Sequence, residues 1–396
     1  ADRLAAHVAA VRVALLRVSE PDERREGSPT RRTLLTGAAA VLAGAGAGAA
    51  AGALVARDDP APTPQLAAGS VAGGDGGPWH VVAPGGSIQQ TIDGGARAIQ
   101  LGEGEYPVDA PIVPTPGCTI RGIGEATVLR AMADLDAVIA IGAGGPVGGV
   151  TIADLVVDAA KRAAIGIDLD IVGTEGNFQG EPDSVCRLDN LWVIDAALDG
   201  IAYRGTDTQA CTTSRVRVRR AGRHGFRIEA PDNVWIACEA TTAGPEGAGF
   251  YVGEAIEGSD GIGAGNCHFH ACKAWYCKGY GWQVATGRNS FVGCEAQDVA
   301  KHGWYITGPR STFSACSADT AGMADVGGTP GTADGFYVVP AKEVALVGCM
   351  AFDRAPGPLV EQQRYGFNVP KALVDDGLLV APIGWGNTDG LINARR

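Results

Sequence analysis

Apolar positions recur at a fixed interval in the second half of the chain. From about residue 186, a small residue, a cysteine, a variable residue and an alanine return as a unit, with the cysteines at Cys238, Cys272, Cys294, Cys316 and Cys349. These cysteines are 34, 22, 22 and 33 residues apart. Because side chains alternate faces along a strand, the cysteine and the alanine two positions later share one face. The pattern therefore predicts repeated strands rather than helices.

Two further columns follow the same interval. A glycine followed by an aromatic residue occurs in each unit, at Gly225, Gly249, Gly281, Gly303, Gly335 and Gly366. A large apolar residue stands three positions before each cysteine, at Trp235, Phe269, Phe291, Phe313 and Leu346. An interval of about 22 residues plus insertions fits one turn of a three-strand coil, and stacked coils join such columns into one core. The sequence therefore predicts an all-β solenoid.

The earlier part of the chain follows the same plan. Residues 87–93 are expected to form a short capping helix, and strands are expected within 99–108, 118–129 and 150–158. This order, with Gly104-Glu-Tyr106 and Arg121-Gly-Ile-Gly124, resembles the start of pectate-lyase-like proteins. The resemblance covers about residues 79–380. It implies a right-handed, single-stranded parallel β-helix, a fold that hosts lyases, hydrolases, esterases, epimerases and phage tailspikes.

The first 64 residues differ from the rest. An arginine pair, Arg31 and Arg32, precedes an Ala/Gly/Val/Leu run without charges over residues 38–56, and a proline-rich linker follows. This order resembles a twin-arginine export signal. It predicts a secreted protein whose residues 1–64 are a largely disordered or helical signal and linker, and whose residues 65–396 form one β-helix domain. Contact with a membrane is expected only through the signal.

The amino-acid composition excludes several classes of protein. The 396 residues include 59 glycines without a three-residue period, which excludes collagen, and 46% apolar residues are too many for a disordered chain. Glycine at this frequency also disfavours long helices. The formal net charge of −12 makes the chain a poor general binder of nucleic acid, so no nucleic-acid partner is expected.

The ten cysteines are expected to be mostly free. Five recur once per coil on an inward column, where thiols stack as small apolar groups, although a few stacked pairs would come within disulfide reach. No closely paired Cys-x-x-Cys suggests zinc, and His268 and His270 beside Cys267 form only a weak metal motif. No cofactor is predicted, with calcium as the alternative for a lyase.

An outward strip beside the Gly-aromatic column carries the candidate chemistry. Asp199 and His224 fall on neighbouring coils, as do His302 and Asp334, so each pair is expected to lie about 5 Å apart along the backbone and to perform acid–base catalysis. The predicted substrate-binding residues are carboxylate-binding arginines, sugar-stacking tyrosines and two outward carboxylates: Arg220, Arg223, Arg227, Tyr280, Tyr305, Tyr337, Asp298 and Asp319. Loops near 173–184, 253–265, 322–333 and 354–364 are expected to line the site.

Arg223-His224-Gly225 and Lys301-His302-Gly303 resemble the Gly-His-Gly strand of polygalacturonases, which implies that His224 or His302 takes the position of that family's histidine. The leading hypothesis is an exported hydrolase or lyase acting on an acidic, uronate-containing polysaccharide. One alternative is a non-catalytic carbohydrate-binding or tailspike-like adhesive β-helix. Another is an isomerase or cyclase with a small organic substrate. The oligomeric state stays open, a trimer included.

Overall fold

The computed structural model describes residues 79–173, 185–254, 263–339, 343–354 and 362–396. The chain divides into two units, Ala1–Gln65 and Leu66–Arg396, and every described residue belongs to the second. The expected export signal and linker lie outside the described residues, as do most of the expected loops at 173–184, 253–265 and 354–364. The fourth loop, 322–333, is described and contains a short 3-10 helix, η3 (Ala324–Val326).

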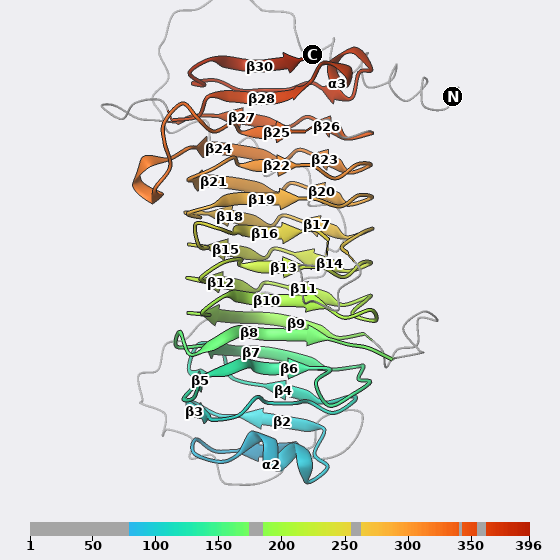
Figure 1. Ribbon diagram of the computed structural model, residues 1–396. Coiled ribbons are helices and arrows are strands. Elements are labelled where there is room, and N and C mark those ends of the chain that lie inside the picture. Colours follow the sequence, from blue (N-terminus) through green and yellow to red (C-terminus); the bar gives the residue numbers. More distant parts are fainter. Residues whose placement is uncertain (1–78, 174–184, 255–262, 340–342, 355–361) are drawn as a thin grey trace, which may run out of the picture. The chain divides into compact units, whose positions relative to one another are not determined.

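The strands of the second unit wind into coils that stack on one another (Figure 1). They form one 20-stranded and one 10-stranded sheet, and every pairing between described strands is parallel. Connections between parallel strands of the same sheet are almost always right-handed. The all-β, right-handed parallel β-helix predicted from the sequence is therefore confirmed.

Three faces make up the coils. Face 1 consists of β1 (His80–Val82), β2 (Ala98–Leu101), β4 (Thr119–Arg121), β7 (Thr151–Asp158), β9 (Arg187–Ile194), β11 (Thr212–Ser214), β14 (Val234–Ile236), β17 (His268–His270), β20 (Ser290–Val292), β23 (Thr312–Ser314), β26 (Ala345–Val347) and β29 (Leu379–Val380). Face 2 consists of β3 (Gly104–Val108), β5 (Thr127–Ala131), β12 (Arg217–Arg219), β15 (Glu239–Thr241), β18 (Lys273–Trp275), β21 (Glu295–Val299), β24 (Ser317–Ala321) and β27 (Met350–Phe352). The long strands β7 and β9 extend across both faces and join them into the 20-stranded sheet.

Face 3 is the 10-stranded sheet. It consists of β6 (Leu135–Ile141), β8 (Ala163–Asp170), β10 (Asp199–Arg204), β13 (Phe226–Ile228), β16 (Ala248–Val252), β19 (Tyr280–Val284), β22 (Trp304–Ile306), β25 (Phe336–Val338), β28 (Tyr365–Pro370) and β30 (Gly390–Arg395). The described residues also contain two short α-helices, α2 (Ile88–Asp93) and α3 (Lys371–Asp375). The expected capping helix is α2, and the side chain of Ser87 caps its first turn.

The predicted columns meet in the core. Phe269, Phe291 and Phe313 occupy one register position on face 1 and stack with ring centroids 4.8 and 4.6 Å apart. The aromatic column of face 3 stacks in the same way, and the Trp282 ring meets the Phe291 ring edge-on at 5.6 Å. Two aromatic ladders therefore pack against each other along the centre of the solenoid.

A close approach of successive backbones explains the glycine column. A Cβ at Gly281 would lie 2.7 Å from the carbonyl oxygen of Gly303 on the next coil and 2.7 Å from the Cβ of Ala296. The same contacts recur at Gly225 and Gly335. There is no room for a side chain between the two backbones at this position, so the glycine is required by packing rather than by a turn.

The residue before each of the five repeat cysteines makes the corner between faces 1 and 2. Ala237, Ala271 and Ala315 have positive φ angles near 51°, and Gly293 and Gly348 take the equivalent positions. The side chain at this corner is small because the left-handed conformation disfavours bulk. All ten cysteines are buried and free, so the thiols form no bridges among the described residues and stack as predicted.

Candidate functional site

The outward side chains of face 3 form a continuous strip, here called the outer strip. Strand register aligns Arg227, Tyr251, Gln283, Tyr305 and Tyr337 along it. A second row lies at the start of each strand or two residues before it, and it includes the four predicted catalytic residues, Asp199, His224, His302 and Asp334. The structure therefore brings each predicted Asp–His pair together on neighbouring coils.

The first pair is more deeply buried than expected. The Asp199 side chain is fully buried, its carboxylate accepts hydrogen bonds from both sides of the Arg223 guanidinium, and the backbone N–H of His224 donates to it at 3.2 Å. Burial alone would raise the pKa of Asp199, but hydrogen bonding to Arg223 and the neighbouring positive charge hold it below its usual value. Asp199 was predicted to point outward, but the arginine of the next coil covers it, so the side chain is buried.

His224 is held through the backbone. Its Nδ1 accepts a hydrogen bond from the N–H of Ala248 at 3.1 Å, and its ring stacks on Tyr251 with centroids 4.9 Å apart. Burial lowers the pKa of His224 to about 4, so the ring is neutral at pH 7 and carries its proton on Nε2. His224 can therefore donate a hydrogen bond, but only 4% of the residue is exposed.

The second pair repeats this construction and is more open. The N–H of Asp334 donates to Nδ1 of His302 at 2.9 Å, and the His302 ring stacks on Tyr337 at 4.5 Å. Burial lowers the pKa of His302 to about 4, again leaving a neutral ring with Nε2–H. The His302 side chain is 18% exposed, so a ligand can reach it, whereas Asp334 is fully buried.

Arg364 and Asn368 hold the Asp334 carboxylate. Arg364 donates to both oxygens at 2.9 and 2.7 Å, and the Asn368 side chain donates at 2.9 Å. The sequence predicted Asp334 in an outward row beside an imidazole. Its carboxylate does lie 3.6 Å from Nδ1 of His302, but the side chain is fully buried. An alternating pattern shows which residues point outward but does not show which neighbours cover them.

The predicted carboxylate-binding arginines already bind carboxylates of the protein. Arg223 pairs with Asp199, Arg227 pairs with Glu229 at 2.7 Å, and the Arg220 guanidinium pairs with Asp195. Their abundance in an acidic chain reflects acidic residues on the same and neighbouring coils. A substrate carboxylate would have to displace these internal partners.

The predicted stacking tyrosines do form an aromatic surface. The rings of Tyr280, Tyr305 and Tyr337 follow one another with centroids 5.0 and 5.8 Å apart, and all three are half-buried. Two cations that sequence reasoning missed flank them. The Lys301 ammonium lies 5.1 Å from the Tyr280 ring centroid, and Arg395 lies over Tyr337 at 4.5 Å and donates to its hydroxyl at 3.0 Å.

Arg395 and Lys301 differ from the other basic residues of the strip. Within the described part of the chain, neither forms a salt bridge with a carboxylate. Arg395 comes from the last strand, β30, where the cysteine and glycine–aromatic markers have ended. The only sequence feature that could have pointed to Arg395 is the alternation along β30, which places it on the same face as Asn393, the residue paired with Asn368 of β28.

Asp298 and Asp319 lie at the corner between faces 2 and 3. Both contact the guanidinium of Arg354, with the Asp319 Oδ2 at 3.2 Å from Nε. Burial raises the pKa of Asp319 to about 6, with Thr320 and Arg354 opposing this effect. Asp298, expected to face outward, is almost completely buried, because the Arg354 side chain covers it.

The described residues contain no group of three or more His, Cys, Asp or Glu side chains placed to hold a metal ion, the His268 and His270 region included. Among the same residues, no helix is long and apolar enough to span a membrane.

Comparison with known proteins identifies the fold. No family model and no curated protein sequence matches this chain. Among solved structures, it is similar to the A-module of mannuronan C-5 epimerase AlgE4 from Azotobacter vinelandii, with a TM-score of 0.52 and 15% identity over 77% of this chain and 92% of that chain. It is also similar to the Dettilon tailspike protein, with a TM-score of 0.51 and 12% identity over 79% of this chain and 68% of the other.

A third similar structure is tailspike protein 2 from the Escherichia coli O157:H7 bacteriophage CAB120. The TM-score is 0.52 and the identity 14%, over 67% of this chain and 35% of the tailspike. At these identities the likeness concerns the parallel β-helix fold. The resemblance to pectate-lyase-like proteins in particular, and the twin-arginine signal, stay predictions.

Proposed function

We propose that this chain is an exported protein that acts on an acidic polysaccharide, and that the outer strip around His302 is its active site. The observation that carries the proposal is the row of Tyr280, Tyr305 and Tyr337 beside two cations, Lys301 and Arg395, that have no carboxylate partner among the described residues. Aromatic rings pack against the C–H faces of sugars, and the cations attract uronate carboxylates. A strip with both features suits a chain of acidic sugars.

The exposed fraction favours the second Asp–His pair as the catalytic one. His302 is 18% exposed, whereas His224 lies beneath Tyr251 and is almost inaccessible. In the proposed site, the neutral His302 donates a hydrogen bond from Nε2 to a substrate oxygen. Asp334 and Arg364 act as positioning residues, because they fix the backbone N–H that holds the ring.

The neighbouring phenol supports elimination as the reaction. The Tyr337 hydroxyl accepts a hydrogen bond from a guanidinium nitrogen of Arg395 at 3.0 Å, which places a fixed positive charge beside that oxygen. As the phenolate, Tyr337 removes the proton on C5 of a uronate, the C4–O bond breaks and a C4=C5 double bond forms. The same hydroxyl then returns the proton to the departing oxygen, so that the phenolate is regenerated.

The similar structures are compatible with this assignment. One of them is named a mannuronan C-5 epimerase, and its name implies chemistry at C5 of an acidic sugar polymer. The low identity limits that comparison to the fold, so the proposal rests on the residues of the outer strip. The steps above need no cofactor. In a lyase of this kind, a calcium ion would bind the substrate carboxylate in addition.

Hydrolysis at the face 2 corner is the second candidate. It is favoured by Asp319, whose pKa is raised to about 6 and which shares Arg354 with Asp298. Two neighbouring carboxyl groups, one of them with a raised pKa, form the arrangement that glycoside hydrolysis uses. In this alternative Asp319 protonates the leaving oxygen and Asp298 activates water.

The test is a product assay on polygalacturonate, alginate and neutral glucans. Elimination creates an unsaturated uronate that absorbs ultraviolet light, whereas hydrolysis creates only reducing ends. We expect unsaturated products from a uronate polymer and their loss in Tyr337→Phe, with Tyr276→Phe at the face 2 corner as the control. Reducing ends alone, abolished by Asp319→Asn, would replace elimination by hydrolysis. Binding of these polymers without turnover would make the chain a carbohydrate-binding protein instead.

A further inference from the structure

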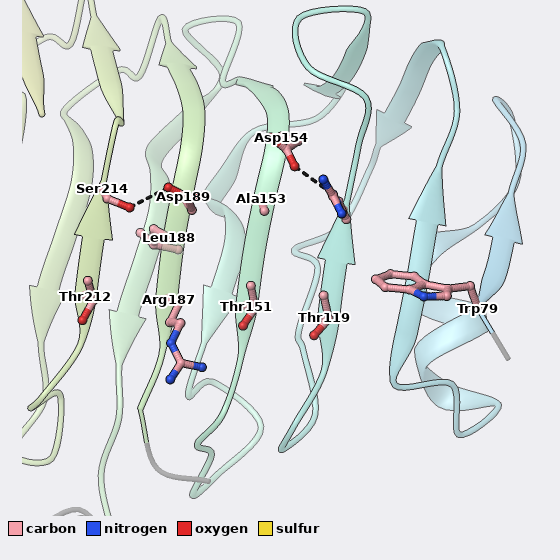
Figure 2. A pocket seen from close by; sticks show the side chains of 11 residues that line it. Trp79, Thr119, Thr151, Ala153, Asp154, Arg187, Leu188, Asp189, Thr212 and Ser214 are labelled. Atoms are coloured by element: carbon pink, nitrogen blue, oxygen red, sulfur yellow. Dashed lines mark hydrogen bonds and ion pairs between the residues drawn. The ribbon is translucent and has the colours of Figure 1, made fainter. Parts of the chain in front are cut away.

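A polar groove lies on face 1, away from the outer strip. It has a volume of about 500 Å³, within the range of small-molecule sites, and crosses the outward side of β4, β7, β9 and β11 (Figure 2). Its lining combines one indole, several hydroxyls and charged side chains: Trp79, Thr119, Arg121, Thr151, Asp154, Arg187, Asp189, Thr212 and Ser214. We call it the N-terminal groove.

Strand register explains the shape of the groove. Thr119, Thr151, Arg187 and Thr212 occupy one outward row on four successive coils. Trp79 continues this row, because the next residue, His80, pairs with Ile99, and Ala98 then stands between Trp79 and Thr119. Small side chains at Ala98 in this row and Ala153 in the next leave a hollow between larger neighbours.

The three threonines present hydroxyls to this hollow. The side-chain oxygens of Thr119, Thr151 and Thr212 form no hydrogen bond with any described residue. They are partly buried, and successive positions in the row are about 4.8 Å apart, so that the row from Thr119 to Thr212 spans about 14 Å. A ligand with several hydroxyls could satisfy them in sequence.

The groove carries one positive charge without a counterpart. Asp154 is bound by Arg121 at 2.8 Å and by the Asn190 side chain, and Asp189 is bound by Ser214 and Arg215. The Arg187 guanidinium has no hydrogen bond or ion pair with the residues that the structure describes. Figure 2 shows it between Thr151 and Thr212, pointing away from both carboxylates.

We propose that the N-terminal groove is a second glycan-binding site that takes a short acidic oligosaccharide. Its carboxylate pairs with Arg187, its hydroxyls bond to the threonine row, and one sugar ring packs on the indole of Trp79. An aromatic face together with a row of hydroxyls selects a sugar rather than a simple anion, and the unpaired guanidinium selects an acidic sugar. The site lies on a different sheet from the outer strip and does not depend on the function proposed there.

The test is calorimetric titration of the full chain with trigalacturonate. The measurement uses a Lys301→Ala, Arg395→Ala background, which removes both cations of the outer strip. We expect binding at one site, at least tenfold weaker after Arg187→Ala or Trp79→Ala and partly kept in Arg187→Lys. Arg310→Ala, which removes an exposed arginine outside the groove, is the matched control and should bind as the background does.

Two other ligands separate the sources of affinity. Neutral maltotriose should bind at least tenfold more weakly than trigalacturonate, and inorganic phosphate should not compete at equal concentration. Unchanged affinity in Arg187→Ala and Trp79→Ala, equal binding of maltotriose, or effective competition by phosphate would each overturn the proposal. Polymer turnover in Arg187→Ala should match wild type, so that failure of this site and failure of the outer strip give different results.

Discussion

The N–H of Asp334 donates to Nδ1 of His302 over 2.9 Å, and the backbone of one residue therefore fixes the ring of the other. The Asp334 carboxylate itself is bound by Arg364, with its Oδ2 3.6 Å from the same ring nitrogen. Asp199 and His224 repeat part of this arrangement with Ala248 as the backbone donor. An imidazole held in this way offers Nε2–H as a donor and keeps Nδ1 occupied.

Replacing the accessible histidine should affect turnover most. His302→Ala removes the donor beside Tyr337 and should lower turnover of the uronate substrate by 10²-fold or more. His224→Ala should change it less than tenfold, because that ring is covered. The exposed His270 on face 1 provides the control, and initial rates of the three variants make the comparison. Equal loss in His224→Ala and His302→Ala would contradict the choice between the two pairs.

The buried histidines should make the protein sensitive to acid. The pKa of each ring lies near 4 in the folded chain and near 6.5 when unfolded, so the unfolded chain binds more protons between these values. The free energy of unfolding should therefore fall as the pH drops from about 6.5 to about 4, by up to about 3 kcal/mol per ring.

Chemical denaturation at several pH values measures this effect. Asp319 has a raised pKa and acts in the opposite direction, but its contribution cancels when wild type is compared with His302→Gln. The variant should show a shallower fall than wild type over this range. An identical pH profile would mean that His302 is not neutral and desolvated.

The buried ion pair should matter far more than an exposed one. Arg364→Ala leaves the Asp334 carboxylate buried without its main partner and should cost about 3–5 kcal/mol of unfolding free energy. Arg310→Ala removes an exposed pair with Glu343, in which both side chains are about two-thirds exposed, and should cost less than about 1 kcal/mol. Similar losses in urea denaturation would contradict the burial of Asp334.

Columns were predictable from the sequence because one coil repeats the environment of the last. The Phe291 and Trp282 ladders, the inward cysteine column and the helix at residues 87–93 each follow from local pattern and spacing. The repeat interval also predicts which residues lie on neighbouring coils, and in this way it predicted the contact between His302 and Asp334.

Side-chain partners were not predictable in the same way. Period-2 alternation assigns Asp199 and Asp298 to the outside, but the burial of each depends on an arginine from another coil, Arg223 or Arg354. The N-terminal groove depends on small residues, Ala98 and Ala153, in rows that only strand register defines. Such features depend on contacts between residues far apart in the chain.

The glycine column should tolerate no side chain. Gly281→Ala places a Cβ against the carbonyl oxygen of Gly303 and against Ala296, and should cost more than about 3 kcal/mol or prevent folding. Gly293→Ala is the matched control, because no atom lies within 4 Å of its added Cβ and alanine occupies the equivalent corner at Ala271. It should cost about 1–2 kcal/mol, from its positive φ alone.

Thermal unfolding followed by circular dichroism compares the two glycine variants. A lower melting temperature for Gly293→Ala than for Gly281→Ala would contradict the packing explanation of the column.

The most direct test of the proposed function is a crystal structure of Tyr337→Phe with a bound uronate oligosaccharide. We predict sugar rings along Tyr280 and Tyr305, a carboxylate at Arg395 or Lys301, and Nε2 of His302 within hydrogen-bond distance of a sugar oxygen. An oligosaccharide bound at Asp298 and Asp319 instead, with the outer strip empty, would contradict the assignment of the active site to face 3.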